Sequence, residues 1–340
     1  MTKARENSDY TGLAADIVAG DTAARAGRKN LILNGSMQIS QRGASHATTG
    51  YGSLDRFQLN LSGGSCTMSQ ESLALGETAV PANINKFLRL TTTSGNDNLG
   101  FLQHIEGVDT YEGVVTFSLY AKGTNPAGGN LNIQVSQNFG TGGSPSSVVA
   151  LTEQTLTVTG TWTKYDFQFT LPSLTGKTKG TAGDDYIAIF IRQPDVATGA
   201  WTADFTGVQL ELGSVATDFE HRSYGEELQL CKRYCQELCD GVATETPIGN
   251  LNYYNTTALY GTIQLPVEMR ASPTGTIADG TLFYVFSNSA GPATLSLAVG
   301  AVSSKCIELI ATTSARTSGA SAFLRTNGNA AASILLTSEL

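Results

Sequence analysis

Residues 115–120 read Val-Thr-Phe-Ser-Leu-Tyr, and this short stretch decides the fold class. Apolar side chains alternate with polar or amphipathic ones, as in a β-strand that turns one face to a core and the other to solvent. The same alternation returns at residues 131–136 and 165–171. Clusters of Gly, Asn, Pro and Ser at 123–130 and 140–147 separate these stretches and favour turns. The pattern predicts antiparallel strands joined by loops.

Working outward, residues 30–219 continue this pattern and predict a jelly-roll β-sandwich. The stretch from Ile187 to Ile191 is apolar on both faces, which we interpret as a central strand covered on both sides. Val208, Leu210 and Leu212 alternate with polar residues and predict the last strand, ending at Gly213, where the chain can turn freely.

Residues 220–239 predict the one helix. Ser223 followed by Glu226 matches a capping box. An apolar stripe follows at spacings of four and three residues, and it would pack either on a sheet or on symmetry copies of itself. The stripe, which we expect to serve helix packing and trimer contact, comprises Tyr224, Leu228, Cys231, Cys235 and Leu238.

Two further segments flank these. Residues 1–29 are polar and small, and are expected to form an extended arm that orders on a partner, or a floppy tail. Residues 240–340 predict a second, smaller β-sandwich, with strands within 255–267, 282–286, 307–310 and 334–336. Only four basic and five acidic residues occur in 241–340, which suits a domain that hides surface against neighbours. The expected fold class is therefore all-β, with one connecting α-helix.

The composition excludes several classes of function. A net charge of −8 and a pI near 4.9 argue against binding of nucleic acid, which needs clustered Lys and Arg. The sequence contains no run of about 20 apolar residues, so no membrane-spanning segment is expected. No apolar leader is expected either, so the product should be soluble and made in the cytosol.

The cysteines and histidines predict neither disulfides nor a metal site. Cys231, Cys235 and Cys239 share one face of the expected helix and cannot all pair there. His46, His104 and His221 lie far apart, without metal-binding spacing. We expect no cofactor and no metal. Calcium bound by loop carboxylates is an alternative that stays open, although the sequence has no EF-type loop.

Several motifs together resemble a known family. They are 30–43 (NLILNGSMQISQRG) with Asp55-Arg56-Phe57, 160–165 (GTWTKY), 208–223 (VQLELGSVATDFEHRS), 266–274 (PVEMRASPT) and 337–340 (TSEL). The chain is similar, over residues 30–340, to tail fibre and minor structural proteins of tailed bacteriophages that contain a carbohydrate-binding-like jelly roll. Asp218 departs from that family, which usually has Pro there. The resemblance implies a homotrimer in the virion, attached to other virion proteins through the N-terminal arm.

No reaction centre is expected. Glycoside cleavage needs two facing carboxylates, whereas Asp184 and Asp185 are adjacent and would point to opposite faces of a strand. Glycan binding would instead use exposed aromatic rings that stack on sugars. The candidates are Tyr51, Trp201, Tyr253 and Tyr254.

Each candidate has an alternative interpretation. Trp162 and Trp201 also fit a sandwich core, and a trimer contact explains an outward Tyr253 or Tyr254 as well as a sugar does. We therefore expect a non-enzymatic virion protein, made in the host bacterial cytoplasm: a trimeric tail fibre that binds a host-surface polysaccharide. The alternative is a head or tail decoration or adaptor protein that binds only other virion proteins.

Overall fold

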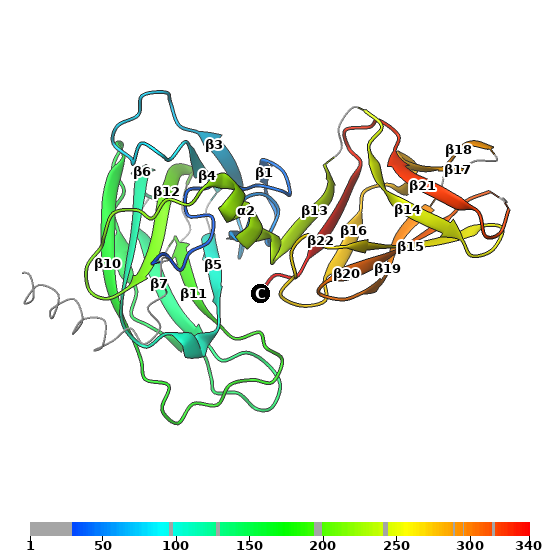
Figure 1. Cartoon of the computed structure of the whole chain (residues 1–340). Coiled ribbons are helices and arrows are strands. Elements are labelled where there is room, and N and C mark those ends of the chain that lie inside the picture. The colour runs from blue at the N-terminus through cyan, green and yellow to red at the C-terminus, as the bar shows by residue number, and fades with distance from the viewer. Residues whose placement is uncertain are drawn as a thin grey trace, which may run out of the picture. The chain divides into compact units, whose positions relative to one another are not determined.

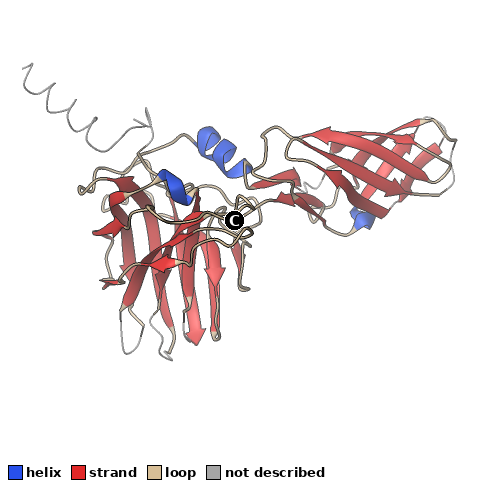
Figure 2. Ribbon diagram, turned by 90° about the horizontal axis from the view of Figure 1, so that it is seen from below, coloured by secondary structure: helices blue, strands red, loops and turns tan. Residues whose placement is uncertain are grey.

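The structure, a computed structural model, describes residues 29–94, 98–126, 130–193, 199–240, 244–287, 290–294, 296–314 and 317–340. The expected arm lies outside these residues, apart from Lys29. Strands dominate the described chain (Figure 2), which confirms the all-β class. Its contacts divide into two units. Unit 1 comprises residues up to Gln38 with His46–Gly50 and Phe57–Arg222, and unit 2 comprises Ile39–Ser45, Tyr51–Arg56 and Ser223–Leu340.

Unit 1 is a sandwich of two antiparallel sheets (Figure 1). The first sheet has the order β1 (Ser45–His46), β3 (Ser65–Ser72), β4 (Lys86–Ser94), β12 (Trp201–Leu212), β6 (Gly113–Gly123) and β10 (Thr163–Leu171). The second has the order β2 (Gln58–Asn60), β5 (Gly100–Glu106), β11 (Tyr186–Arg192), β7 (Leu131–Asn138) and β8 (Val149–Ala150), and β9 (Gln154–Leu156) also pairs with β7. A 3-10 turn, η1 (Val108–Thr110), follows β5.

Alternating side chains fill the space between these two sheets. Val115, Phe117 and Leu119 of β6 are fully buried, and so are Ile133 and Val135 of β7. Each buried side chain of this size contributes roughly 1.5–3 kcal/mol of transfer free energy. The period-two pattern in the sequence therefore identified the inward face of these strands correctly.

The chain itself covers the outward face of the first sheet over strand β12. Gln209 and Glu211 of β12 are buried there because the segment after the strand folds over them. Glu211 accepts a hydrogen bond from the Thr217 amide at 2.8 Å, and Gln209 accepts one from the Glu220 amide at 2.9 Å. Elsewhere on this sheet, the Trp162 ring packs on the Phe87 ring of β4 with ring centroids 5.5 Å apart. Polar outward side chains of β12 are thereby withdrawn from solvent, whereas Thr67 of β3 and Gln168 of β10 remain exposed.

The helix of the described residues, α2 (Tyr224–Lys232), begins as expected. The Ser223 hydroxyl accepts a hydrogen bond from the Glu226 amide, which satisfies one free amide of the first turn. The predicted range of 220–239 is wrong, however, because residues 235–240 form strand β13 (Cys235–Asp240). This strand pairs with the chain end, Cys235 opposite Thr337, and no local sequence window contains that partner.

Unit 2 holds two further sheets that share one apolar core. The smaller sheet has the order β13, β22 (Ser333–Thr337) and β16 (Thr274–Ile277). The seven-stranded sheet has the order β18 (Ala290–Thr294), β17 (Phe283–Ser287), β21 (Ser321–Thr326), β14 (Pro247–Tyr253), β15 (Ala258–Gln264), β20 (Cys306–Thr312) and β19 (Ser296–Val302), with the turn η2 (Gly280–Leu282) before β17. All four strands that the sequence predicted in 240–340 are present. Within the described residues, no helix is long and apolar enough to cross a bilayer.

A cluster of buried charges joins two early segments to the end of the chain inside unit 2. Glu339 accepts hydrogen bonds from Arg42, at 2.8 Å, and from Arg56. The Arg56 guanidinium also lies 3.5 Å from the centre of the Tyr234 ring, and Arg42 lies 3.7 Å from Asp55. Unit 1 consequently lacks residues 39–45 and 51–56 and ends at Arg222, unlike the predicted domain of 30–219.

The charges of this cluster compensate one another. Burial lowers the pKa of Arg56, but the Glu339 carboxylate together with Tyr51, Tyr234 and Cys231 raises it by more, so the guanidinium stays charged. Burial also raises the pKa of Asp55, against the opposite effects of Arg42 and of hydrogen bonds from Gln41. Removing one partner would leave the others as uncompensated charges in the interior.

Replacing Glu339 with Gln should lower the free energy of unfolding by about 3–5 kcal/mol, because two buried arginines lose their carboxylate. Urea denaturation of the full chain, followed by circular dichroism, measures this loss. Glu268→Gln is the matched control, since exposed Glu268 forms an ion pair with exposed Lys305 at 3.6 Å and accepts a hydrogen bond from the Ser304 hydroxyl. This substitution should change stability by less than about 1 kcal/mol. Equal effects of the two substitutions would contradict the role of the cluster.

Candidate functional site

The outward face of the second sheet of unit 1 differs from that of the first. Ile187, Ile189 and Ile191 of β11 point into the core, so the residues between them point outward. Outward side chains of this sheet are partly exposed, except for the small, nearly buried Ala188 and for Gly100. We call the following set the open face: Gln58, Asn60, Leu102, His104, Glu106, Asn132, Gln134, Ser136, Asn138, Tyr186, Ala188, Phe190 and Arg192.

Strand register places aromatic and amide side chains next to each other on the open face. Phe190 lies opposite Leu102 on one neighbouring strand and Gln134 on the other. Ala188, in the next row, lies between His104 and Ser136. The Phe190 ring flanked by the Gln134 amide, beside the small side chains of Ala188 and Ser136, gives both a flat apolar surface and hydrogen-bonding groups.

At one end of the open face two rings stack. The His104 and Tyr186 ring centroids lie 3.8 Å apart at an interplanar angle of 24°. Asn138 donates a hydrogen bond to the Tyr186 hydroxyl at 3.0 Å. Burial raises the pKa of this phenol, and nearby Asp184 adds to the increase, against the effect of Asn138. The hydroxyl therefore remains protonated at neutral pH and can still donate a hydrogen bond.

At the other end a polar network fixes the side chains. The Arg192 Nε donates to Glu153 at 2.8 Å, and Asn132 donates to the second oxygen of the same carboxylate at 2.8 Å. Asn60 donates to the carbonyl of Asn98 at 2.6 Å. These hydrogen bonds hold the amides and the guanidinium in defined orientations. The side chains therefore lose less conformational entropy when a ligand binds.

The open face is long enough for an extended ligand. From Tyr186 to Arg192 the strand advances about 20 Å, at about 3.3 Å per residue. The carboxylates of Glu106, on the open face, and of Glu153, beside it, lie near opposite ends, because Glu106 is opposite Tyr186 and Glu153 contacts Arg192. A separation of about 20 Å along the strands exceeds the roughly 5–9.5 Å at which paired carboxylates cleave a glycosidic bond.

The structure does not bring the four predicted glycan contacts together. Trp201 is 3% exposed and donates its indole N–H to Gln193 at 3.0 Å, so the core interpretation applies and its prediction as a sugar contact is wrong. Tyr253 is likewise buried, whereas Tyr254 is 77% exposed. Tyr51 is half-buried in unit 2, with its ring 5.5 Å from the Arg42 guanidinium and its hydroxyl bonded to the Leu340 carbonyl.

These burial values predict opposite behaviour for two aromatic substitutions. Trp201→Ala should lower the free energy of unfolding by about 3–5 kcal/mol, through lost transfer energy and a cavity. Tyr254→Ala should change it by no more than about 0.5 kcal/mol, because little surface is buried there. Thermal denaturation of both full-length variants provides the measurement. A stable, well-folded Trp201→Ala protein would contradict the placement of this ring in the core.

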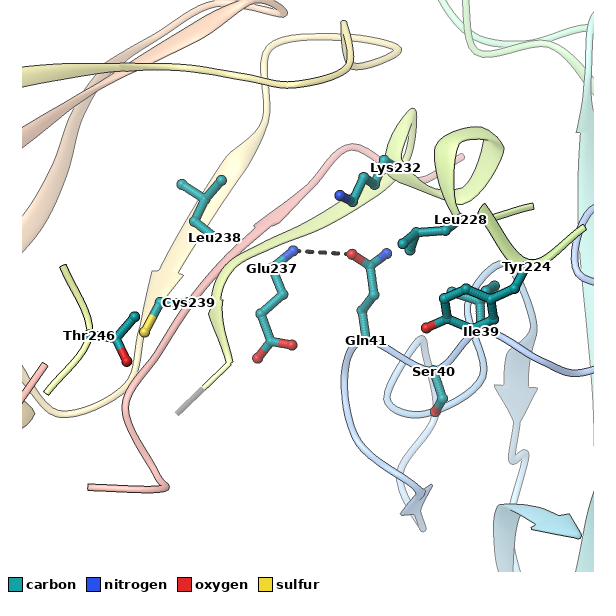
Figure 3. Close-up of a pocket in the computed structure, with 10 residues that line it drawn as sticks. All are labelled: Ile39, Ser40, Gln41, Tyr224, Leu228, Lys232, Glu237, Leu238, Cys239 and Thr246. Atoms are coloured by element: carbon teal, nitrogen blue, oxygen red, sulfur yellow. Dashed lines mark hydrogen bonds between the residues drawn. The ribbon is translucent and has the colours of Figure 1, made fainter. Parts of the chain in front are cut away.

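The five residues of the predicted helical stripe also separate. Cys231 is buried on α2, Cys235 is buried on β13, and Leu238 packs on the core of unit 2. Tyr224, Leu228 and Leu238 line a cavity of about 450 Å³ within unit 2 (Figure 3). One uniform helix-packing surface is therefore not present, because strand β13 replaces the second half of the expected helix.

A hydrogen bond crosses that cavity, and two buried cysteines on α2 and β13 stay protonated. The Glu237 amide donates to the Gln41 side chain at 3.3 Å across it (Figure 3). Burial raises the pKa of the Cys231 and Cys235 thiols far above neutrality, so neither is a ready thiolate ligand. Among the described residues, no three His, Cys, Asp or Glu side chains gather closely enough to hold a metal ion.

Sequence reasoning missed the open face. The stretch from Ile187 to Ile191 suggested a strand covered on both sides, yet Phe190 is partly exposed. The side-chain amides of Asn132 and Gln134 indicated only that one side of this strand faces solvent. Their alternation with apolar residues was the available signal, but only the strand register places Gln134 beside Phe190.

No protein-family model and no curated protein sequence matches this chain. Solved structures align with about half of it. A putative sugar binding protein from Bacteroides thetaiotaomicron VPI-5482 aligns at a TM-score of 0.35 and 14% identity, over 54% of this chain and 99% of that one. The enzymatically active domain of tailspike protein 4 from Bacteriophage CBA120 aligns at 0.33 and 13%, over 54% and 21%. A family 16 carbohydrate binding module aligns at 0.31 and 16%, over 53% and 99%. At such TM-scores these similarities assign neither family nor function.

Proposed function

We propose that this chain is a non-catalytic structural and attachment protein of a tailed bacteriophage, and that its open face binds a host-surface glycan. The observation that carries the glycan-binding role is the row of Phe190 with Gln134, between the stacked His104 and Tyr186 at one end and Arg192 at the other. This is a set of planar rings with hydrogen-bonding groups beside them.

Sugars match these groups chemically. A pyranose ring presents apolar C–H groups on its faces and hydroxyl groups around its rim. Aromatic side chains stack on the faces, while amide and guanidinium groups bond to the hydroxyls. Strand β12 of the first sheet offers no comparable surface, since its outward residues Gln209 and Glu211 already bond to the chain that covers them. The open face is therefore the best-supported ligand surface of unit 1.

The virion assignment has separate support. It rests on the sequence motifs within residues 30–340 that resemble tail fibre and minor structural proteins of tailed phages. In this proposal the arm of residues 1–29 attaches the chain to other virion proteins. Three copies would present three open faces, and the resulting multivalency would compensate for a modest affinity of each site. A decoration or adaptor protein that binds only virion proteins is the competing proposal.

Binding of the full-length chain to purified bacterial surface polysaccharides, measured by isothermal titration calorimetry, tests the glycan site. Phe190→Ala and Gln134→Ala should each weaken binding about tenfold. A stacked ring or a hydrogen bond between neutral groups each contributes on the order of 1.4 kcal/mol to binding. The control is Thr67→Ala, an exposed residue of the first sheet, which should bind like the wild type.

Two results would count against this site. Equal binding by Phe190→Ala and wild type would exclude the open face. An absence of binding to every polysaccharide of the host, together with firm attachment to another virion protein, would favour the decoration or adaptor role instead.

The proposal also includes an absence of turnover. Prolonged incubation of a bound polysaccharide with the full chain should leave its size unchanged in size-exclusion chromatography, because Glu106 and Glu153 are too far apart to act together. Depolymerisation that disappears in Glu106→Gln or Glu153→Gln would show that a carboxylate of the open face is catalytic.

A further inference from the structure

Arg192 carries the one fixed positive charge among the residues that define the open face. His104 is the other basic residue of this set, and with histidine counted as neutral it adds no charge at pH 7. Glu106 is the acidic residue of the set. The environment of the Arg192 guanidinium therefore decides whether a negatively charged sugar can bind.

The strand neighbours of Arg192 are uncharged. Register places it between Gly100 of β5 and Asn132 of β7, and Asn60 of β2 lies on the far side of Gly100. A counter-charge for the guanidinium has to come from outside this row.

Glu153, in the loop before β9, supplies that counter-charge. Its carboxylate accepts a hydrogen bond from Arg192 Nε at 2.8 Å and one from the Asn132 amide, also at 2.8 Å. A second guanidinium nitrogen of Arg192 donates to the side chain of Asn98. The Arg192 side chain is consequently only 12% exposed, compared with 22% for Glu153. Because Arg192 and Asn132 both point outward, the carboxylate that contacts both lies on the side of the sheet where a ligand would bind.

We propose that Glu153 makes the open face select neutral polysaccharides over acidic ones, an inference that rests on the proposed glycan-binding function. A sugar carboxylate at this end would have to share the Arg192 guanidinium with Glu153, and the two carboxylates would repel each other. A neutral hydroxyl meets no such repulsion. It can donate a hydrogen bond to the side-chain oxygen of Asn132 or Asn60, whose amide nitrogens already donate to Glu153 and to the Asn98 carbonyl.

The opposite end of the open face does not favour an acidic sugar either. Glu106 lies there, opposite Tyr186 in the strand register. Lys179, near this end, is already paired with Asp109 at 2.9 Å and lies 3.5 Å from Asp185. The two ends are about 20 Å apart, more than twice the screening length of about 8 Å at physiological salt, so the charges at one end do not offset those at the other. An ionised sugar would therefore lose hydration at either end without gaining a cation of its own.

Host surface polysaccharides, separated by anion-exchange chromatography into a neutral and an acidic fraction, test this selectivity. Isothermal titration calorimetry gives the association constant of the full-length chain for each fraction. The wild type should bind the neutral fraction at least about tenfold more tightly than the acidic one. This preference is measured without any substitution, so it does not depend on the folding of a variant.

Glu153→Gln tests the role of this residue. The ratio of the acidic to the neutral association constant should rise about tenfold, because the substitution removes a negative charge in contact with Arg192. The gained binding should weaken as sodium chloride is added, since it is electrostatic. Arg192→Gln/Glu153→Gln, which also removes the guanidinium, should lose the gain. A loss of packing alone would produce neither the change in ratio nor its dependence on salt.

Asp166→Asn is the matched control. It removes the same charge from the whole chain, but at an exposed position of β10 in the first sheet, so the ratio should stay that of the wild type. Circular dichroism establishes that each variant is folded before the ratios are compared.

The possible failures are distinguishable. Wild-type binding to the acidic fraction as tight as to the neutral one would overturn this inference and leave glycan binding intact. A folded Glu153→Gln protein with the wild-type ratio, or an equal rise in Asp166→Asn, would also overturn it. Binding to neither fraction would contradict the proposed function itself, and this inference with it.

Discussion

The structure depends on one geometric constraint: successive side chains of a strand point to opposite faces, so each sheet that encloses a core has a second face. That face must be covered, solvated or offered to a partner. Unit 1 covers part of one such face, over β12, with the segment that follows this strand, as the bond from the Thr217 amide to Glu211 shows. Its other outward face, around Phe190, stays accessible. The candidate glycan site is a second face of this kind.

A second constraint concerns buried charge. Arg42 and Arg56 come early in the chain, and both bond to Glu339 near its end. Such a cluster is costly to bury unless every member is paired, so it requires three distant segments to be in place together. It adds specificity to unit 2, whose core is otherwise apolar, and it explains why residues 39–45 and 51–56 belong to that unit.

The sequence predicted the periodic parts of the fold well and the sites poorly. Alternation in β6 and β7 identified buried residues such as Phe117 and Ile133, since that pattern is local. The helix start at Ser223 was also correct, because a capping box is local. The helix end was wrong, since β13 forms by pairing with β22 about 100 residues away. Among the aromatic candidates, Tyr254 is exposed but Trp201 is not, because composition cannot tell an inward ring from an outward one.

The amino-acid sequence by itself determined the all-β class, the position of most strands, the helix cap and the low charge of residues 241–340. These features depend on neighbours in the chain, or on composition alone. Only the tertiary structure decided which outward faces are covered, which rows of side chains meet, and which charges pair. Strand register sets these relations between residues far apart in sequence, so Phe190 becomes the neighbour of Gln134, and Phe286 that of Phe323, only after folding.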